Sequence, residues 1–348
     1  MTPKAAFVVR RSYHQHAEDP VRRPLFGPPV RCYAPRVDVL FLLGGLALLV
    51  LGGERLVRSA ASLAFRLGLS PLVIGLSVVA FGTSAPELAA TLASSVGGVP
   101  DLGVGNVVGS NIANVALILA VAALIVPIPV NRVFVRRDLP AALIAMAVLV
   151  PLAADGMIGR IDGLILLGLL AAYLVLMFRQ DKGDATSEVE EVAEPSTPIW
   201  RSTAGVAIGV GLLVVGAEGV VTGAVGIAEA LGVSERVIGL TLVAFGTSLP
   251  ELASSIAAVR HRQGDMILGN IAGSSVFNVL AVMGAASATV GIPVRLSAIA
   301  PDLAVAAFVT ALLIPVMLIS GRLGRAPAGL LILMYAAYIT FVFITPGG

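Results

Sequence analysis

Residues 74–89 read IGLSVVAFGTSAPELA, and residues 238–253 read IGLTLVAFGTSLPELA, with three differences between them. The two stretches lie 164 positions apart, and the same offset aligns GNVVGSNIAN at 105–114 with GNIAGSSVFN at 269–278. A constant offset without gaps indicates that one unit, about residues 37–178, is duplicated as about 199–348. We therefore expect the two halves of the chain to share one fold.

The composition indicates that lipid surrounds most of the chain. Hydrophobic residues make up 57% of it and charged residues only 13%, more apolar surface than one soluble core can bury. Apolar runs near the twenty residues that cross a bilayer occur about ten times. They cover about 38–57, 71–97, 102–125, 138–154, 161–178, 202–222, 235–259, 266–290, 296–319 and 326–345. We expect an all-α integral membrane protein, because the alternation typical of a barrel is absent and unpaired backbone groups are costly in hydrocarbon.

Each duplicated unit contains five of these runs, and an odd number of spans inverts the second copy in the membrane. The sequence therefore predicts ten transmembrane helices as two inverted five-helix repeats. Such repeats are typical of transporters, whose binding site lies near the midplane between the copies. Residues 1–36 are expected to be a disordered basic tail or a mis-called start, and residues 179–198 an acidic linker.

The distribution of arginine predicts the orientation of the spans. The loops after spans one, three, seven and nine hold ten arginines, against three in the alternate loops. The ten are Arg55, Arg58, Arg66, Arg132, Arg136, Arg137, Arg260, Arg262, Arg322 and Arg325; the three are Arg160, Arg236 and Arg295. Arginine-rich short loops stay in the cytoplasm. We expect both termini outside and the acidic linker inside, an assignment that the basic tail contradicts.

Two acidic residues fall near the centres of predicted spans. Glu87 lies in the second span and Glu251 in the seventh, in identical surroundings. A bare carboxylate at the bilayer centre costs about 2.5 kcal/mol or much more, so such residues are usually functional. A protonated glutamic acid that only joins two helices is the alternative, and the repetition of the motif argues against it.

Oxygen donors surround each acid. Thr83 and Thr247 precede the acids by one helical turn and share their face, and Ser84 and Ser248 follow the threonines. Pro86 and Pro250 cannot donate to the carbonyls four residues earlier, so each helix should kink there. Nearby carbonyls, among them those of Ala80 and Ala244, are then expected to turn inward.

Spans three and eight each carry a polar stripe. Asn106, Ser110 and Asn114 are spaced by four, and Asn270, Ser274 and Asn278 repeat that spacing. Hydrogen bonding between helices is the alternative function of such residues, and it suits Asn106 and Asn270 best.

Together these residues form a hard-cation site, with two carboxylates, hydroxyls, amide oxygens and carbonyls but no thiolate or imidazole. Ca²⁺ accepts six to eight such oxygens, whereas softer metals favour Cys or His. One Ca²⁺ or two Na⁺ would neutralise two carboxylates, and the empty pair is costly to move through the membrane. The sequence therefore favours antiport of these cations.

At these motifs the sequence resembles the sodium/calcium exchanger branch of the cation/calcium exchanger superfamily. The resemblance covers nearly all of the chain from about Val37, through GTSAPE with GSNIAN and GTSLPE with GSSVFN. It implies that the acids at Glu87 and Glu251 bind both ions, with help at the positions of Ala80, Thr83, Ser84, Ser110, Asn114, Ala244, Thr247, Ser248 and Ser274. It also implies that spans one and six slide across the other helices. Several such exchangers have an acid where this chain has Asn278.

Two other transport functions and one enzymatic function remain open at this stage. A Ca²⁺/H⁺ antiporter differs only in its counter-ion, and a cation channel only in lacking coupling. An intramembrane metalloprotease would need a motif such as His-Glu-x-x-His, and the only histidines are His14, His16 and His261. We expect no enzymatic activity, no cofactor, no nucleic acid and no protein partner, only lipid and the transported ions. The expected location is the cell membrane of a bacterium or archaeon.

Overall fold

The computed structural model describes residues 35–181, 197–232 and 244–344 of the chain, and these are almost entirely helical. The first half contains α1 (Pro35–Leu67), α2 (Pro71–Ile74), η1 (Gly75–Val79), α3 (Ala80–Thr83), α4 (Ala85–Val96), α5 (Pro100–Ala113), η2 (Asn114–Leu119), α6 (Ala120–Ile125), η3 (Phe134–Asp138), α7 (Leu139–Leu152) and α8 (Arg160–Gln180). The second half contains α10 (Ile199–Ala230), α12 (Ala244–Gly246), α13 (Leu249–Arg260), α14 (Gly264–Phe277), η5 (Asn278–Met283), α15 (Gly284–Val290), α16 (Leu296–Ser320) and α17 (Arg325–Ile344). The η segments are short π-helical stretches inside longer helices.

Many of these helices are long and apolar enough to cross a bilayer. Seven in the described part of the chain meet that description, and an eighth does when the segments 71–83 and 85–96, bent by 43°, are taken as one span. Helix lies within each of the ten predicted spans, although 235–243 falls outside the described residues. The chain is therefore a multi-pass, all-helical membrane protein.

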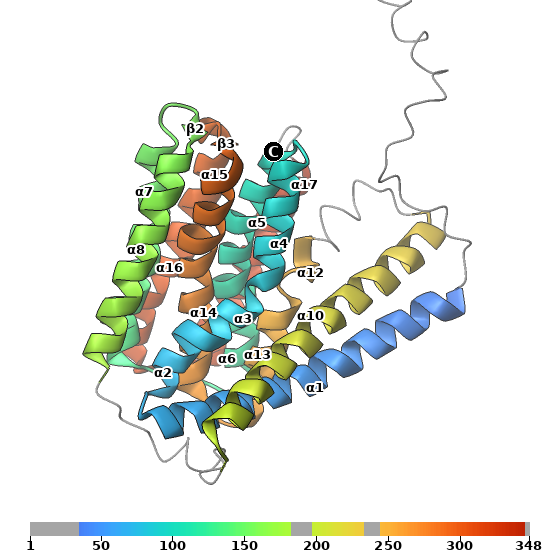
Figure 1. Ribbon diagram of the computed structural model, residues 1–348, viewed down its shortest axis with the longest axis vertical. Coiled ribbons are helices and arrows are strands. Elements are labelled where there is room, and N and C mark those ends of the chain that lie inside the picture. The colour runs from blue at the N-terminus through green and yellow to red at the C-terminus, as the bar shows by residue number, and fades with distance from the viewer. Residues whose placement is uncertain (1–34, 182–196, 233–243, 345–348) are drawn as a thin grey trace, which may run out of the picture. The chain divides into compact units, whose positions relative to one another are not determined.

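Helices α1 and α10 are longer than the spans predicted at 38–57 and 202–222. They contain 33 and 32 residues, about 50 Å of helix at 1.5 Å per residue, against a hydrocarbon core of about 30 Å. In α1 the charged Arg55 and Arg58 end the apolar run without ending the helix. α1 stops just before Gly68, at φ +64°, and α10 stops two residues before Gly232, at φ +78°. In Figure 1 the two helices lie side by side and slant across the remaining ones.

Glycine allows the backbones of α1 and α10 to touch. A Cβ atom at Gly45 would lie 2.5 Å from the amide nitrogen of Val220, and one at Gly209 would lie 2.7 Å from that of Leu56. Because the earlier residue of α1 meets the later residue of α10, the two helices run antiparallel. The pair therefore packs through small residues, as membrane helices commonly do.

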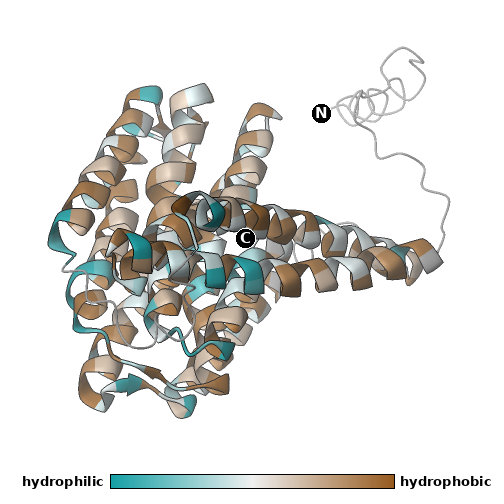
Figure 2. Cartoon of the chain, turned by 60° about the horizontal axis from the view of Figure 1, so that its bottom comes forward, coloured by the Kyte–Doolittle hydropathy of each residue, from teal (hydrophilic) through white to brown (hydrophobic). Residues whose placement is uncertain are grey.

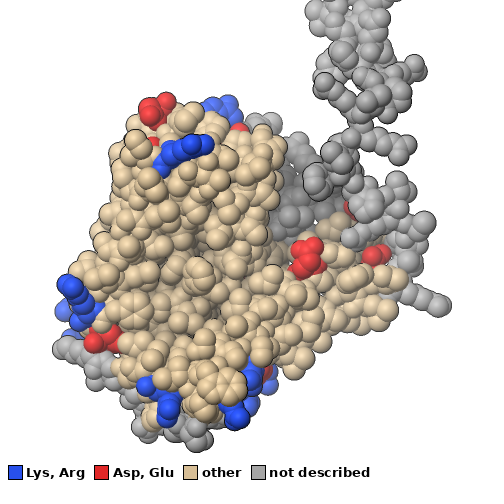
Figure 3. Space-filling view, in the orientation of Figure 1, with Lys and Arg blue, Asp and Glu red and all other residues tan. Residues whose placement is uncertain are grey.

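The two helices with polar stripes form the core. In residues 264–290, which comprise α14, η5 and α15, 94% of the most apolar 18-residue stretch is buried inside the protein, and in residues 100–125 the buried share of the corresponding stretch is 72%. For the other single-helix candidate spans it is at most 33%. Figure 2 shows hydrophobic residues along the outer helices, and in Figure 3 most of the lysine and arginine side chains in view lie toward the ends of the helices. The most polar helix faces are thus enclosed by apolar ones.

Short strand pairs sort the loops into two groups. β1 (Ile128–Pro129) pairs with β4 (Arg322–Leu323), and β2 (Met157–Ile158) pairs with β3 (Ile292–Pro293), both antiparallel. The loops after α6 and α16 therefore lie together, as do the loops after α7 and α15. This grouping is the one that the arginine distribution predicted for these four loops.

Candidate cation-binding site

Both acids stand at the start of a helix that follows a break. Ser84 has φ −81° and ψ 7° between α3 and α4, and Ser248 has φ −90° and ψ 5° before α13. The next helix in each half begins with a proline in its first turn, followed by Glu87 or Glu251. The helix is therefore interrupted two residues before each proline, and in the first half the segments on either side are bent by 43°.

The two carboxyl groups come together from the two halves of the chain. Both glutamate residues are fully buried, at 0% exposure. Ser248 Oγ donates to Glu87 Oε1 at 3.3 Å, and Ser84 Oγ donates to Glu251 Oε1 at 3.4 Å. Each serine thus binds the acid of the other repeat. The second oxygen of each carboxyl, Oε2, has no hydrogen-bond partner among the described residues.

Each threonine of the motifs also donates a hydrogen bond to a residue of the other half. Thr83 Oγ1 donates to Asn270 Oδ1, and Thr247 Oγ1 donates to Asn106 Oδ1, both at 3.2 Å. Asn106 also donates through Nδ2 to the Glu87 carbonyl, at 3.4 Å. These contacts support the structural interpretation of Asn106 and Asn270, because both amides join helices.

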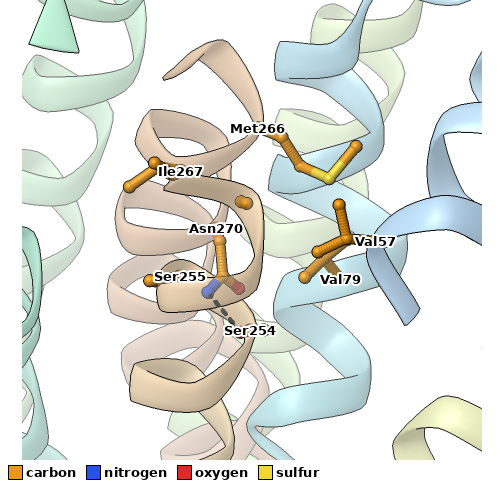
Figure 4. A pocket seen from close by; sticks show the side chains of 8 residues that line it. Val57, Val79, Ser254, Ser255, Met266, Ile267 and Asn270 are labelled. Atoms are coloured by element: carbon orange, nitrogen blue, oxygen red, sulfur yellow. Dashed lines mark hydrogen bonds between the residues drawn. The ribbon is translucent and has the colours of Figure 1, made fainter. Parts of the chain in front are cut away.

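Asn270 is linked to Glu251 through Ser254, a serine outside the two predicted motifs. Its Nδ2 donates to Ser254 Oγ at 3.3 Å, and Ser254 Oγ donates to the Glu251 carbonyl at 3.0 Å. Figure 4 shows Asn270 and Ser254 beside a narrow crevice that has no room for a water molecule. This contact therefore belongs to tight packing beside the acids.

The remaining polar residues of the stripes are buried. The hydroxyl oxygens of Ser110 and Ser248 lie 3.4 Å apart, and Ser274 lies beside the Glu251 carboxyl. Asn114 and Asn278 are at most 1% exposed, and each begins a π-helical segment, η2 or η5. Both amide atoms of Asn114, and Oδ1 of Asn278, have no hydrogen-bond partner among the described residues.

The two backbone carbonyls predicted as ligands, those of Ala80 and Ala244, differ in what the structure describes. The Ala80 carbonyl accepts from the Ser84 amide at 3.0 Å and lies 3.4 Å from Thr83 Oγ1, so a protein group already uses it. The backbone of Ala244 begins α12, and the helix expected before it lies outside the described residues.

The arrangement as a whole suits a hard cation. Five buried oxygens of the candidate residues have no hydrogen-bond partner among the described residues: Oε2 of Glu87 and of Glu251, Oδ1 of Asn114 and of Asn278, and Oγ of Ser274. Leaving such groups unpaired costs free energy, and a cation with oxygen ligands would satisfy them. Within the described residues no three His, Cys, Asp or Glu side chains form a cluster that could hold a metal. The two buried carboxyl groups are the acidic groups of this arrangement, and the other oxygens named here are neutral.

One acidic residue outside the site has several basic side chains as partners. Glu54 on α1 lies 2.8 Å from Arg260, 2.7 Å from His261 and 3.7 Å from Arg58. Its side chain is 21% exposed. Its repeat counterpart Glu218 is exposed on α10.

Broken helices with paired, buried acids between two sequence repeats define a membrane transporter. A sequence model of the sodium/calcium exchanger protein family matches this chain twice, over residues 37–179 and 201–344. The chain belongs to the sodium/calcium exchanger family and is a cation/Ca²⁺ antiporter.

Relatives and a solved structure agree with this assignment. The chain is 40% identical to the inner membrane protein YrbG of Escherichia coli over 70% of this chain and 77% of YrbG. It is 33% identical to the sodium/calcium exchanger MaX1 of Methanosarcina acetivorans over 71% of this chain and 82% of MaX1. It also resembles the structure of the sodium-calcium exchanger NCX_Mj soaked with Na⁺ and Sr²⁺, with a TM-score of 0.77, 33% identity, and coverage of 88% of this chain and 99% of that one.

Proposed function

We propose that this protein exchanges Ca²⁺ for Na⁺ across the cell membrane by alternating access to one site between its two repeats. The observation that supports this most is the pair of buried carboxyls from opposite halves, each with one oxygen bound by the other half's serine and one oxygen unpartnered. Two carboxylates are neutralised by one Ca²⁺ or by two Na⁺, so either load makes the site less costly to move.

The proposed ligands are the buried polar groups of the two broken helices and the two core helices. They are Glu87, Glu251, Thr83, Thr247, Ser84, Ser248, Ser110, Asn114, Ser274, Asn278 and the carbonyls of Ala80 and Ala244. The Ala80 carbonyl would join the site after it releases its present partner. The sodium/calcium exchanger name of the relative MaX1 and the Na⁺ and Sr²⁺ soak of NCX_Mj support the choice of ions.

The proposed topology is ten spans in two inverted five-helix repeats, residues 37–178 and 199–348. The loop pairings β1 with β4 and β2 with β3 support it, because each pairs a loop of one half with a loop of the other. Ser70, after α1, donates its amide to Asp181 after α8 at 3.0 Å. The acidic linker thus starts beside an arginine-rich loop, which favours a cytoplasmic linker and outward termini.

The test is Ca²⁺ uptake by the purified protein in sealed proteoliposomes, with Na⁺, K⁺ and H⁺ gradients imposed one at a time. We expect uptake to follow the outward Na⁺ gradient alone. Uptake driven by the H⁺ gradient would make the protein a Ca²⁺/H⁺ antiporter. Uptake that needs no counter-gradient and shows no counterflow would indicate a channel.

A further inference from the structure

A buried asparagine that the sequence pattern did not single out connects the two core helices at the proposed ion site. Asn111, on α5, is 1% exposed. Its Nδ2 donates to the carbonyl of Ser275 on α14 at 3.2 Å, and its Oδ1 accepts from Asn278 Nδ2 at 3.1 Å. The hydrogen bonds therefore form a chain from a backbone carbonyl, through Asn111, to a proposed ligand.

The chemistry of that chain fixes the direction of each amide. The Ser275 carbonyl can only accept, so the atom of Asn111 that faces it must be the nitrogen. The oxygen of Asn111 then faces Asn278, which must answer with its own nitrogen. The oxygen of Asn278 is left fully buried and without a partner among the described residues. An unpartnered acceptor held in this way is suited to a cation.

Among the described residues, the equivalent asparagine of the other half is not oriented by such a chain of hydrogen bonds. Asn114 is the repeat counterpart of Asn278, and neither of its amide atoms has a partner in the described part of the chain. The counterpart of Asn111 is Ser275, whose hydroxyl donates to the carbonyl of Ile271 in its own helix at 2.9 Å. The two amides at the site are thus oriented differently although their sequence surroundings repeat.

We propose that Asn111 is a positioning residue that holds the Asn278 amide with its oxygen toward the transported cation. The inference rests on the proposed function, because it assigns Asn278 as a ligand. Asn111 also disfavours an ionised acid at position 278, since a carboxylate there would bring an oxygen against Asn111 Oδ1. Of the two proposed ligand amides, Asn114 and Asn278, the one that the described hydrogen bonds orient is therefore kept neutral and turned toward the ion.

The experiment is a double-mutant cycle on Ca²⁺ binding to the purified full-length protein, measured with ⁴⁵Ca²⁺. Asn111→Ala should weaken binding about tenfold in the parent, because the Asn278 amide loses its direction and one ion ligand. Asn278→Ala leaves both carboxylates in place, so binding should weaken but stay measurable. In that background Asn111→Ala should have no further effect, because residues that act through one group are not additive.

The matched control is Ser275→Ala, which removes only the hydroxyl bonded to Ile271 and keeps the carbonyl that Asn111 uses. It should bind Ca²⁺ like the parent. If Asn111→Ala does not give a monodisperse protein, Asn111→Ser replaces it, since serine is the residue at the equivalent place in the other repeat.

Two results would overturn the inference: an equal loss of binding from the Asn111 change in both backgrounds, or no loss in the parent. Failure of the proposed function looks different. In that case the parent itself shows no Na⁺-driven Ca²⁺ uptake.

Discussion

Replacing Glu87 by glutamine tests the site most sharply, because the change removes a charge and almost no volume. Ser248 donates to Glu87 Oε1, and the amide oxygen of glutamine can accept the same hydrogen bond. The nitrogen then takes the place of Oε2, the oxygen without a partner. The variant therefore turns a cation acceptor into a donor that points into the site.

The size of the effect follows from burial. Glu87 is 0% exposed, so no water can replace the lost carboxylate as a counter-charge for Ca²⁺. Removing one partner of a buried ionic interaction costs about 3–5 kcal/mol, which corresponds to a loss of about 100-fold or more in Ca²⁺ affinity. The free energy of unfolding should change by about 1 kcal/mol or less, since the serine hydrogen bond is kept. Glu251→Gln should behave in the same way through Ser84.

The assay is Na⁺-driven ⁴⁵Ca²⁺ uptake in proteoliposomes, with thermal unfolding in detergent as the check on folding. Glu218→Gln is the matched control, because it removes an acid that is exposed on α10. It should transport Ca²⁺ at the parent's rate. A folded Glu87→Gln protein that exchanges Ca²⁺ as fast as this control would refute the assignment of the site.

Three further predictions concern topology, charge and packing. A cysteine at position 187, outside the described residues, should escape an impermeant thiol reagent in intact cells when Cys32 is replaced; strong labelling from outside would reverse the topology. Asn278→Asp should make Na⁺-driven Ca²⁺ flux more sensitive to acid than in the parent between about pH 5.5 and 8, because the new carboxyl lies near two others and faces an oxygen of Asn111. Identical pH profiles would place position 278 outside the ion site. Gly269→Val should lower the thermal midpoint strongly, because a Cβ there would lie 2.9 Å from the Leu76 amide nitrogen, whereas Gly44→Ala, which meets nothing within 4 Å, should not; equal midpoints would contradict the packing.

The repeat and the helix breaks were predictable because both can be read from the sequence without knowing how the helices pack. An exact offset relates the halves, and Pro86 and Pro250 have no amide hydrogen for the carbonyls of Gly82 and Gly246, so the helix is interrupted just before each proline. The length of α1 was not predictable from hydropathy, since Arg55 and Arg58 end an apolar run while the helix continues to Leu67. α10 likewise extends beyond the predicted span 202–222, from Ile199 to Ala230.

The pairing across the site could not be predicted from one half alone. That Ser248 binds Glu87, and Ser84 binds Glu251, depends on how the halves pack, although the duplication required the two contacts to match. Asn111 was missed for a related reason: it departs from the repeat, so comparing the halves hides it. The Ala80 carbonyl was expected to turn inward, and instead it accepts a hydrogen bond from the Ser84 amide.

The most direct measurement follows ²²Na⁺ and ⁴⁵Ca²⁺ together in the same sealed vesicles. If one site with two carboxylates carries either load, Na⁺ should leave only when Ca²⁺ enters, in a fixed ratio, and both fluxes should stop together in Glu87→Gln vesicles. With two Na⁺ per Ca²⁺ the exchange would move no net charge. Na⁺ efflux that continues at the same rate without Ca²⁺ outside, or Ca²⁺ uptake without any Na⁺ efflux, would contradict coupled exchange through a shared site.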